Sequence, residues 1–180
     1  MIETSRTFIK VLEESEADLL LDYYLENWDH LEKWQPKREQ GFFTVHNFEK
    51  QLKAAQDGVK AGSSFQFSAI CKETSKVVGV SNFTGLARGP FLACFLGYSI
   101  AKASEGKGLM KEILNGTIEH MFSVEGLNRI MATYMPSNER SGNLLDSLGF
   151  EKEGLARKYL RINGKWEDHI LTSKINEKLT

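Results

Sequence analysis

The chain has 180 residues, of which 41% are hydrophobic and 26% charged, a balance typical of soluble globular domains that excludes disordered, collagen-like and coiled-coil chains. Its 23 Lys and Arg residues nearly cancel its 24 Asp and Glu residues, leaving a net charge of −1, whereas proteins that bind RNA or DNA normally carry a basic excess. No apolar run approaches the roughly 20 residues that span a bilayer. We therefore expect neither nucleic acid nor a membrane among the partners.

The two cysteines and the first residues indicate the compartment. Cys71 and Cys94 each lie in an apolar, strand-like run, which is typical of reduced core residues and not of a disulfide framework. The opening segment MIETSRTFIKVLEE lacks the basic start and apolar stretch of a signal peptide. No repeat or linker divides the chain, so we expect one domain over residues 1–180, located in the cytoplasm.

The first half of the chain predicts three strands and two helices. Ser15 and Asp18 have the spacing of a capping box and mark the start of the first helix. The second helix follows from apolar residues spaced four, three and four apart, and two of the strands follow from alternating or continuous apolar residues. The expected order is a strand at 7–12, a helix, an aromatic-rich loop at 27–43, a helix at 48–59, and strands at 65–71 and 77–83.

The second half predicts the remaining elements and the fold class. Gly149 ends a helix that Asn138 begins, and Asn163-Gly164 is the strongest short hairpin signal, typical of a type I′ turn. The expected order is a buried strand at 91–100, a long helix directly behind Gly108, a strand at 129–135, a helix, and hairpin strands at 156–162 and 166–174. This order predicts an α/β fold with a mixed sheet of about seven strands and about four helices on its two faces.

The glycine-rich segment Gly106-Lys107-Gly108 joins a buried strand to the long helix. Glycines let the backbone approach a ligand closely, and the first free N–H groups of a helix attract anions, so a phosphate or pyrophosphate site is one interpretation. A plain strand-to-helix turn is the other. The dinucleotide pattern GxGxxG fails at Lys111, no GxxxxGKS/T loop exists, and Ser99 lacks the final glycine of a nucleophile elbow.

The four histidines show no metal-ligand spacing, and neither cysteine has a nearby partner of the right kind. They are His30, His46, His120 and His169. We therefore expect no metal site.

The order strand, Arg/Gln-x-x-Gly-x-Gly/Ala, helix, strand and Asn-led helix resembles the GCN5-related N-acetyltransferase (GNAT) superfamily, and within it the RimJ/RimL branch. In this chain Glu105 replaces the usual Arg or Gln, and Met110 replaces the last Gly or Ala. The resemblance covers essentially the whole chain. The segments that carry it are ENWDHLEKWQP (26–36), VSNF (80–83), LGYSI (96–100) and NERSGNLLDSLGFEKEG (138–154), with KWEDHILT near the end.

The resemblance implies a GNAT fold, acetyl-CoA as co-substrate without a metal, and transfer of the acetyl group to an amine. The acceptor that the resemblance implies is the N-terminal alanine of a small-subunit ribosomal protein. Asn138 is implied to bind the amide region of the pantetheine, and Ser141 to lie near its sulfur. The backbone of Tyr98, Ser99 and Ile100 is implied to pair with the pantetheine arm, and that of Glu105, Gly106, Lys107, Gly108, Leu109 and Met110 to hold the pyrophosphate.

The resemblance leaves the acid and base of the reaction open. Many family members carry an acidic Tyr where this chain has Leu145, and one relative has a Glu where this chain has Leu160. Ser141 is the acid we expect in place of the Tyr. Glu26 is the base we name first, although a surface charge is an equal interpretation of it. The other candidate bases are Asp29 and His30.

The acceptor is expected between the aromatic loop and the final hairpin, and its binding residues are predicted to be Asn27, Trp28, Trp34 and Tyr159. An aromatic loop can equally plug a core. Three function classes therefore stand: an N-terminal acetyltransferase for a ribosomal protein, an acetyltransferase for a small amine such as a polyamine or amino sugar, and a non-catalytic acetyl-CoA-binding module in ribosome assembly.

Overall fold

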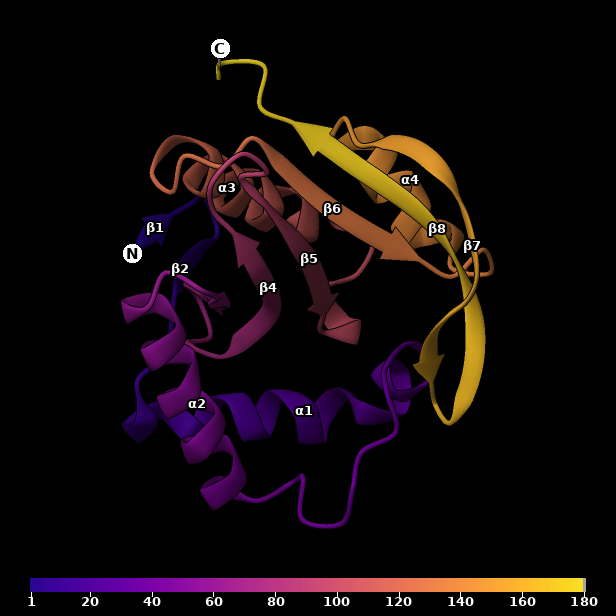
Figure 1. Cartoon of the computed structure of the whole chain (residues 1–180). Helices are drawn as coiled ribbons and strands as arrows, with labels where there is room; N and C mark the ends of the chain where they lie inside the picture. Colours follow the sequence, from indigo (N-terminus) through magenta and orange to yellow (C-terminus); the bar gives the residue numbers. More distant parts are fainter. Residues whose placement is uncertain (180) are drawn as a thin grey trace.

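The computed structural model describes residues 1–179, and their strands form one mixed sheet in the order β1-β2-β3-β4-β5-β6-β8-β7 (Figure 1). The mixed α/β architecture with four α-helices is confirmed, with eight strands in place of about seven. The strands are β1 (Ile2–Glu3), β2 (Thr7–Lys10), β3 (Phe65–Cys71), β4 (Val77–Ala87), β5 (Ala93–Ile100), β6 (Arg129–Tyr134), β7 (Glu151–Ile162) and β8 (Lys165–Ile175). The additional strand is β1, whose two residues are too few to leave a periodic pattern in the sequence.

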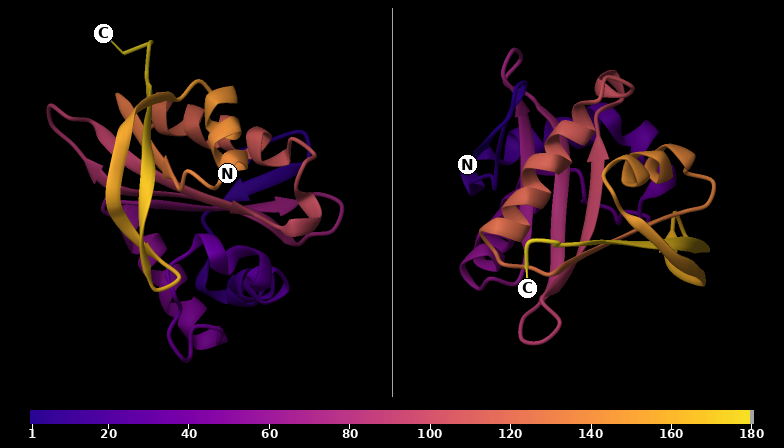
Figure 2. Two further views of the ribbon diagram at one scale, coloured as in Figure 1. Left: turned by 90° about the vertical axis from the view of Figure 1, so that its right-hand side faces the viewer. Right: turned by 90° about the horizontal axis from the view of Figure 1, so that it is seen from above.

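The helices cover both faces of the sheet. They are α1 (Ala17–Leu31), α2 (Val45–Lys60), α3 (Leu109–Ser123) and α4 (Glu139–Ser147), with short 3₁₀ turns η1 (Glu14–Glu16), η2 (Glu32–Trp34) and η3 (Lys102–Ser104). Figure 2 shows α1 and α2 on one face and α3 and α4 on the other. Each face has its own apolar core, around Ile113 and Leu145 under α3 and α4, and around Phe48 and Leu52 against α1. No helix within residues 1–179 is long and apolar enough to cross a membrane.

The sheet opens between β5 and β6, its one parallel pair of neighbouring strands. These strands pair only from Ala93 to Leu96 on β5, whereas β4 stays paired with β5 as far as Ile100. Figure 1 shows β5 and β6 diverging beyond this point. The last residues of β5 therefore keep the edge that faces β6 free, with backbone groups that a ligand can pair with.

The start of the chain corrects two predictions. The segment 27–43 is not all loop, because α1 continues to Leu31. Tyr24, Trp28 and Leu31 continue the apolar spacing of four and three that packs the helix on the core. The capping box also lies earlier than Ser15 and Asp18: it belongs to η1, with Glu13 at the cap and Glu16 as its reciprocal partner.

The boundaries of the remaining elements differ from the predicted ones by a few residues. Helix α2 runs through Gly58 to Lys60, while β4 extends to Ala87. The hairpin strands β7 and β8 are longer than predicted, and the turn between them has positive φ at Asn163 and Gly164, as a type I′ turn requires. The backbone N–H of Asn163 donates to the carbonyl of Gln35 at 2.9 Å, so the hairpin tip is fixed to the segment after η2.

Candidate functional site

A cleft of about 830 Å³ lies where β5 and β6 separate. Three segments line it: the end of α1 with η2, the stretch from Tyr98 on β5 to Lys111 on α3, and the first turns of α4. Of the residues predicted to be catalytic or to bind the cofactor, the cleft collects all except Lys107. The sequence resemblance thus predicted a set of residues that the fold brings to one surface.

The glycine loop has a backbone geometry that suits an anion. Gly106 and Gly108 have φ values of +71° and +69°, in the left-handed region that favours glycine. Gly108 is the N-cap of α3 and offers no side chain to the first N–H groups of the helix, so these donors and the positive end of the helix dipole remain for a ligand. Lys107 turns its ammonium to the carbonyl of Ala103 at 2.8 Å and contributes to the loop through its backbone.

The free end of β5 carries two hydroxyl pairs. Tyr98 Oη lies 2.6 Å from Ser141 Oγ on α4, and Tyr23 Oη lies 2.8 Å from Ser99 Oγ. Burial raises the pKa of Tyr98 to about 12, although its bond to Ser141 acts in the opposite direction. Tyr98 is therefore a neutral phenol at physiological pH, bonded to the one hydroxyl that the resemblance predicts near the sulfur.

Asn138 begins α4, as predicted, and caps it. Its side-chain oxygen accepts the backbone N–H of Ser141 at 3.2 Å. Among residues 1–179 the amide nitrogen of this half-buried side chain has no hydrogen-bond partner. Capping and ligand binding are therefore compatible roles, because each uses a different atom of the amide.

Glu105 connects its own loop to two helices across the cleft, α1 and α4. Its carboxylate lies 2.9 Å from His30 Nε2 at the end of α1 and 2.6 Å from Arg140 Nη1 on α4. The Arg140 guanidinium balances the negative charge of Glu105 beside the glycine loop, at a position where the family pattern has Arg or Gln. The sequence analysis missed Arg140. Its place two residues after the helix-starting Asn138, in the first turn of α4, was the available signal.

The residues predicted to bind the acceptor substrate do not lie together in the structure. Trp34 lines the cleft, but the structure places Trp28 against Phe43 at 5.2 Å between ring centroids, in the aromatic core under α1. Tyr159 lies on the hairpin near His169 and is not among the residues that line the cleft. Glu26 lines the cleft with its carboxylate 2.6 Å from Lys76 Nζ.

Asn27 is buried and does not line the cleft. Its amide nitrogen donates to the carbonyl of Tyr23 at 2.8 Å, and its amide oxygen accepts the backbone N–H of Lys102 at 2.9 Å. Both ends of the side chain are thus used to tie α1 to the segment that follows β5. Asn27 positions the wall of the cleft from behind.

Replacing Asn27 by Ala is expected to lower the free energy of unfolding by about 2 kcal/mol, because it removes both hydrogen bonds of a buried side chain, those to Tyr23 and Lys102. Urea denaturation measures the loss. Asn115→Ala on the exposed face of α3 is the matched control and should leave stability almost unchanged. Equal stability of the two variants would contradict the role assigned to Asn27.

A glycine loop, a free strand edge and a hydroxyl pair converge on one cleft, an arrangement suited to acyl transfer from a phosphate-bearing donor. The family described as "Acetyltransferase (GNAT) domain" matches residues 6–151. The chain belongs to the GNAT acetyltransferase family, and the predicted GNAT fold is confirmed. Within residues 1–179 no three His, Cys, Asp or Glu side chains are grouped as metal ligands.

The individual relatives are similar over almost the whole chain. Ribosomal protein uS5-alanine N-acetyltransferase of Escherichia coli (strain K12) is 42% identical over 96% of this chain and 89% of its own. The crystal structure of ribosomal-protein-S5-alanine acetyltransferase from Vibrio fischeri has a TM-score of 0.95 at 40% identity, over 99% of this chain and 97% of that one. Mycobacterium smegmatis RimJ in complex with CoA-disulfide has a TM-score of 0.87 at 24% identity, covering 98% and 88%, and is similar in fold.

Proposed function

We propose that this protein transfers the acetyl group of acetyl-CoA to the N-terminal alanine of a small-subunit ribosomal protein. The observation that carries the proposal is the single cleft in which the glycine loop, the free edge of β5 and the Tyr98–Ser141 pair meet. The relatives from Escherichia coli and Vibrio fischeri, whose names state an alanine of ribosomal protein uS5 and S5 respectively, support it. Such an acceptor is made in the cytoplasm, where we expect the protein to act.

Acetyl-CoA fits the cleft in one direction. The pyrophosphate would lie on the N–H groups of residues 105–110 at the start of α3, and the pantetheine along Tyr98, Ser99 and Ile100 like an added strand. The free amide nitrogen of Asn138 would bind a pantetheine carbonyl. Homologous folds solved with CoA or acetyl-CoA, among them RimL and MccE, support this choice of co-substrate.

The thioester would then lie where β5 leaves β6. The neutral amine attacks the thioester carbon, a backbone N–H near Ile100 polarises the carbonyl oxygen, and the carbon–sulfur bond breaks as the thiolate takes a proton. Ser141 would donate that proton. Because the Tyr98 phenol stays protonated and lies 2.6 Å from Ser141 Oγ, it can donate to this oxygen and leave the serine hydrogen directed at the sulfur.

The proton of the amine needs only a weak base. An α-amine has a pKa near 8, against about 10.4 for a lysine side chain, so roughly a tenth of it is neutral at pH 7. Glu26 and Asp29 both line the cleft, and water bound to either carboxylate would carry the proton to solvent. His30 also lines the cleft, but its ring is engaged by Glu105.

The charges of the cleft favour a peptide over a polyamine. A polyamine needs several free carboxylates, yet of the three that line the cleft only Asp29 has no ion pair within residues 1–179. Glu105 is paired with His30 and Arg140, and Glu26 with Lys76. An extended peptide instead needs a side-chain surface to pack against. Trp34 supplies one beside Gln35, to which the hairpin tip is bonded.

The proposal can be tested on small-subunit ribosomal proteins purified from cells that lack this protein. Incubated with the enzyme and acetyl-CoA and then weighed by intact-mass spectrometry, one of them should gain a single acetyl group, which fragmentation places on an N-terminal alanine. If no ribosomal protein gains mass while the enzyme binds acetyl-CoA, the proposed acceptor is wrong, and either the small-amine or the non-catalytic function replaces this proposal.

A further inference from the structure

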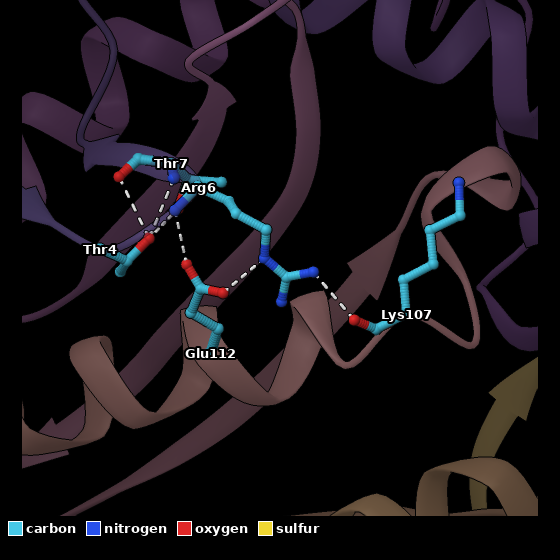
Figure 3. A network of polar contacts seen from close by, with 5 residues as sticks. All are labelled: Thr4, Arg6, Thr7, Lys107 and Glu112. Atoms are coloured by element: carbon cyan, nitrogen blue, oxygen red, sulfur yellow. Dashed lines mark hydrogen bonds and ion pairs between the residues drawn. The ribbon is translucent and has the colours of Figure 1, made fainter.

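Arg6 connects the start of the chain to the glycine loop from a distance of about 100 residues in sequence. Its side chain leaves the turn between β1 and β2, and Nη1 donates to the carbonyl oxygen of Lys107 at 2.9 Å (Figure 3). Nε donates to Glu112 Oε2 at 2.7 Å, and the backbone N–H of Arg6 donates to Glu112 Oε1 at 2.8 Å. Arg6 itself does not line the cleft.

The bond to Lys107 fixes the orientation of a peptide group. Among residues 1–179 no peptide bond is cis, and in a trans peptide the carbonyl and the following N–H point in opposite directions. Because the carbonyl of Lys107 points at Arg6, the N–H of Gly108 points away from Arg6. Because Gly108 lines the cleft and Arg6 does not, we infer that this N–H faces the side on which the anion would bind.

This peptide needs an external support, because glycine alone does not hold it. Gly106 and Gly108 flank Lys107, and a Cβ at either glycine would meet nothing within 4 Å. Packing around these two glycines therefore does not hold the loop backbone, and glycine has the largest conformational freedom to lose. The hydrogen bond from Arg6 is the contact from outside the loop that selects one orientation of the peptide.

Glu112 holds Arg6 in place. It accepts from both the backbone and the guanidinium of Arg6, and it lies in the first turn of α3. Burial disfavours the ionised carboxyl, but contacts with Thr4 and Arg6 outweigh this and lower the pKa of Glu112. The Thr4 hydroxyl also accepts the backbone N–H of Thr7 at 3.0 Å, which orders the turn that carries Arg6 (Figure 3).

We propose that Arg6 is a positioning residue for acetyl-CoA: it holds the Lys107 carbonyl so that the Gly108 N–H is oriented for the pyrophosphate before the cofactor binds. The inference rests on the proposed use of acetyl-CoA and adds a residue outside the cleft to it. Since Arg6 contacts only the loop and the first turn of α3 at this site, its effect is confined to the pyrophosphate end of acetyl-CoA. The pantetheine end, on β5 and α4, does not depend on it.

Arg6→Met keeps the aliphatic stem and removes all the side-chain donors. We expect its Kd for CoA, measured by calorimetry, to rise about tenfold, the value of one hydrogen bond to a charged group. Its kcat/KM with acetyl-pantetheine, which lacks the pyrophosphate, should equal that of the unmodified protein. Arg6→Lys retains one donor and should recover part of the affinity for CoA.

Arg88→Met is the matched control. Arg88 is equally half-exposed and also donates to a carbonyl and a carboxylate, both of Glu125, but away from the cleft. It should bind CoA normally. Unchanged CoA affinity in Arg6→Met, or equal losses with CoA and acetyl-pantetheine, overturns the proposal for Arg6 alone. An unmodified protein that fails to bind CoA overturns the proposed function as well.

Discussion

Replacing Ser141 by Ala is expected to lower kcat about 100-fold, the usual contribution of a positioned general acid, and to leave the KM for acetyl-CoA nearly unchanged. The hydroxyl is removed, while the cap remains, because Asn138 accepts from the backbone N–H of residue 141 and not from its side chain. Steady-state kinetics with an Ala-led peptide measures both constants. Full turnover by this variant would remove Ser141 from the mechanism.

Tyr98→Phe extends the same experiment. It deletes only the phenol oxygen that lies 2.6 Å from Ser141 Oγ, and we expect kcat to fall about tenfold. Because the two hydroxyls act as a unit, the double variant should be no slower than Ser141→Ala. Tyr23→Phe is the matched control, since it breaks a similar bond to Ser99 on the same strand and should change stability more than turnover. Additive losses would argue against the pair.

Gly108→Val is expected to weaken CoA binding by about 10- to 100-fold. A branched residue at φ +69° carries about 1–3 kcal/mol of backbone strain, which the loop relieves by turning its N–H groups away from the anion. Apart from the adjacent residues, no atom lies within 4 Å of an added Cβ, so a clash at the Cβ does not explain the loss. Calorimetry with CoA measures the change.

The control for this loop is Gly154→Val. Gly154 lies on exposed β7, away from the cleft, also has nothing within 4 Å of a Cβ, and has no positive φ. Valine is favoured in strands, so this variant should bind CoA like the unmodified protein. Equal affinities in both variants would show that the left-handed conformation of Gly108 is not needed for the cofactor.

Much of the architecture was predictable because local patterns and tertiary packing agree. The start of α3 behind Gly108 and the cap at Asn138 both follow from the chemistry of helix ends. The prediction of a loop over residues 27–43 failed because local pattern and tertiary packing do not agree there. Trp28 continues the buried stripe of α1, and its packing on Phe42 and Phe43 depends on residues more than ten positions away.

The sequence predicts those parts of the cleft that one continuous stretch of backbone forms. It does not predict the parts that depend on contacts between side chains far apart in the sequence. The glycine loop and the end of β5 lie in one continuous segment, so a motif describes them. The contacts of Asn27 with Lys102 and of Glu105 with His30 and Arg140 join residues far apart in the sequence. Only the folded chain brings these pairs together, and no local spacing indicates them.

The most direct test of this account is the choice of amine. Mass spectrometry would follow acetyl transfer at pH 7 to three acceptors: an Ala-led peptide, a peptide blocked at its N-terminus but containing Lys, and spermidine. We predict one acetyl group on the α-amine of the Ala-led peptide and none on the other two. Acetylated spermidine, or an acetylated lysine, beside an unmodified Ala-led peptide would contradict the proposed acceptor.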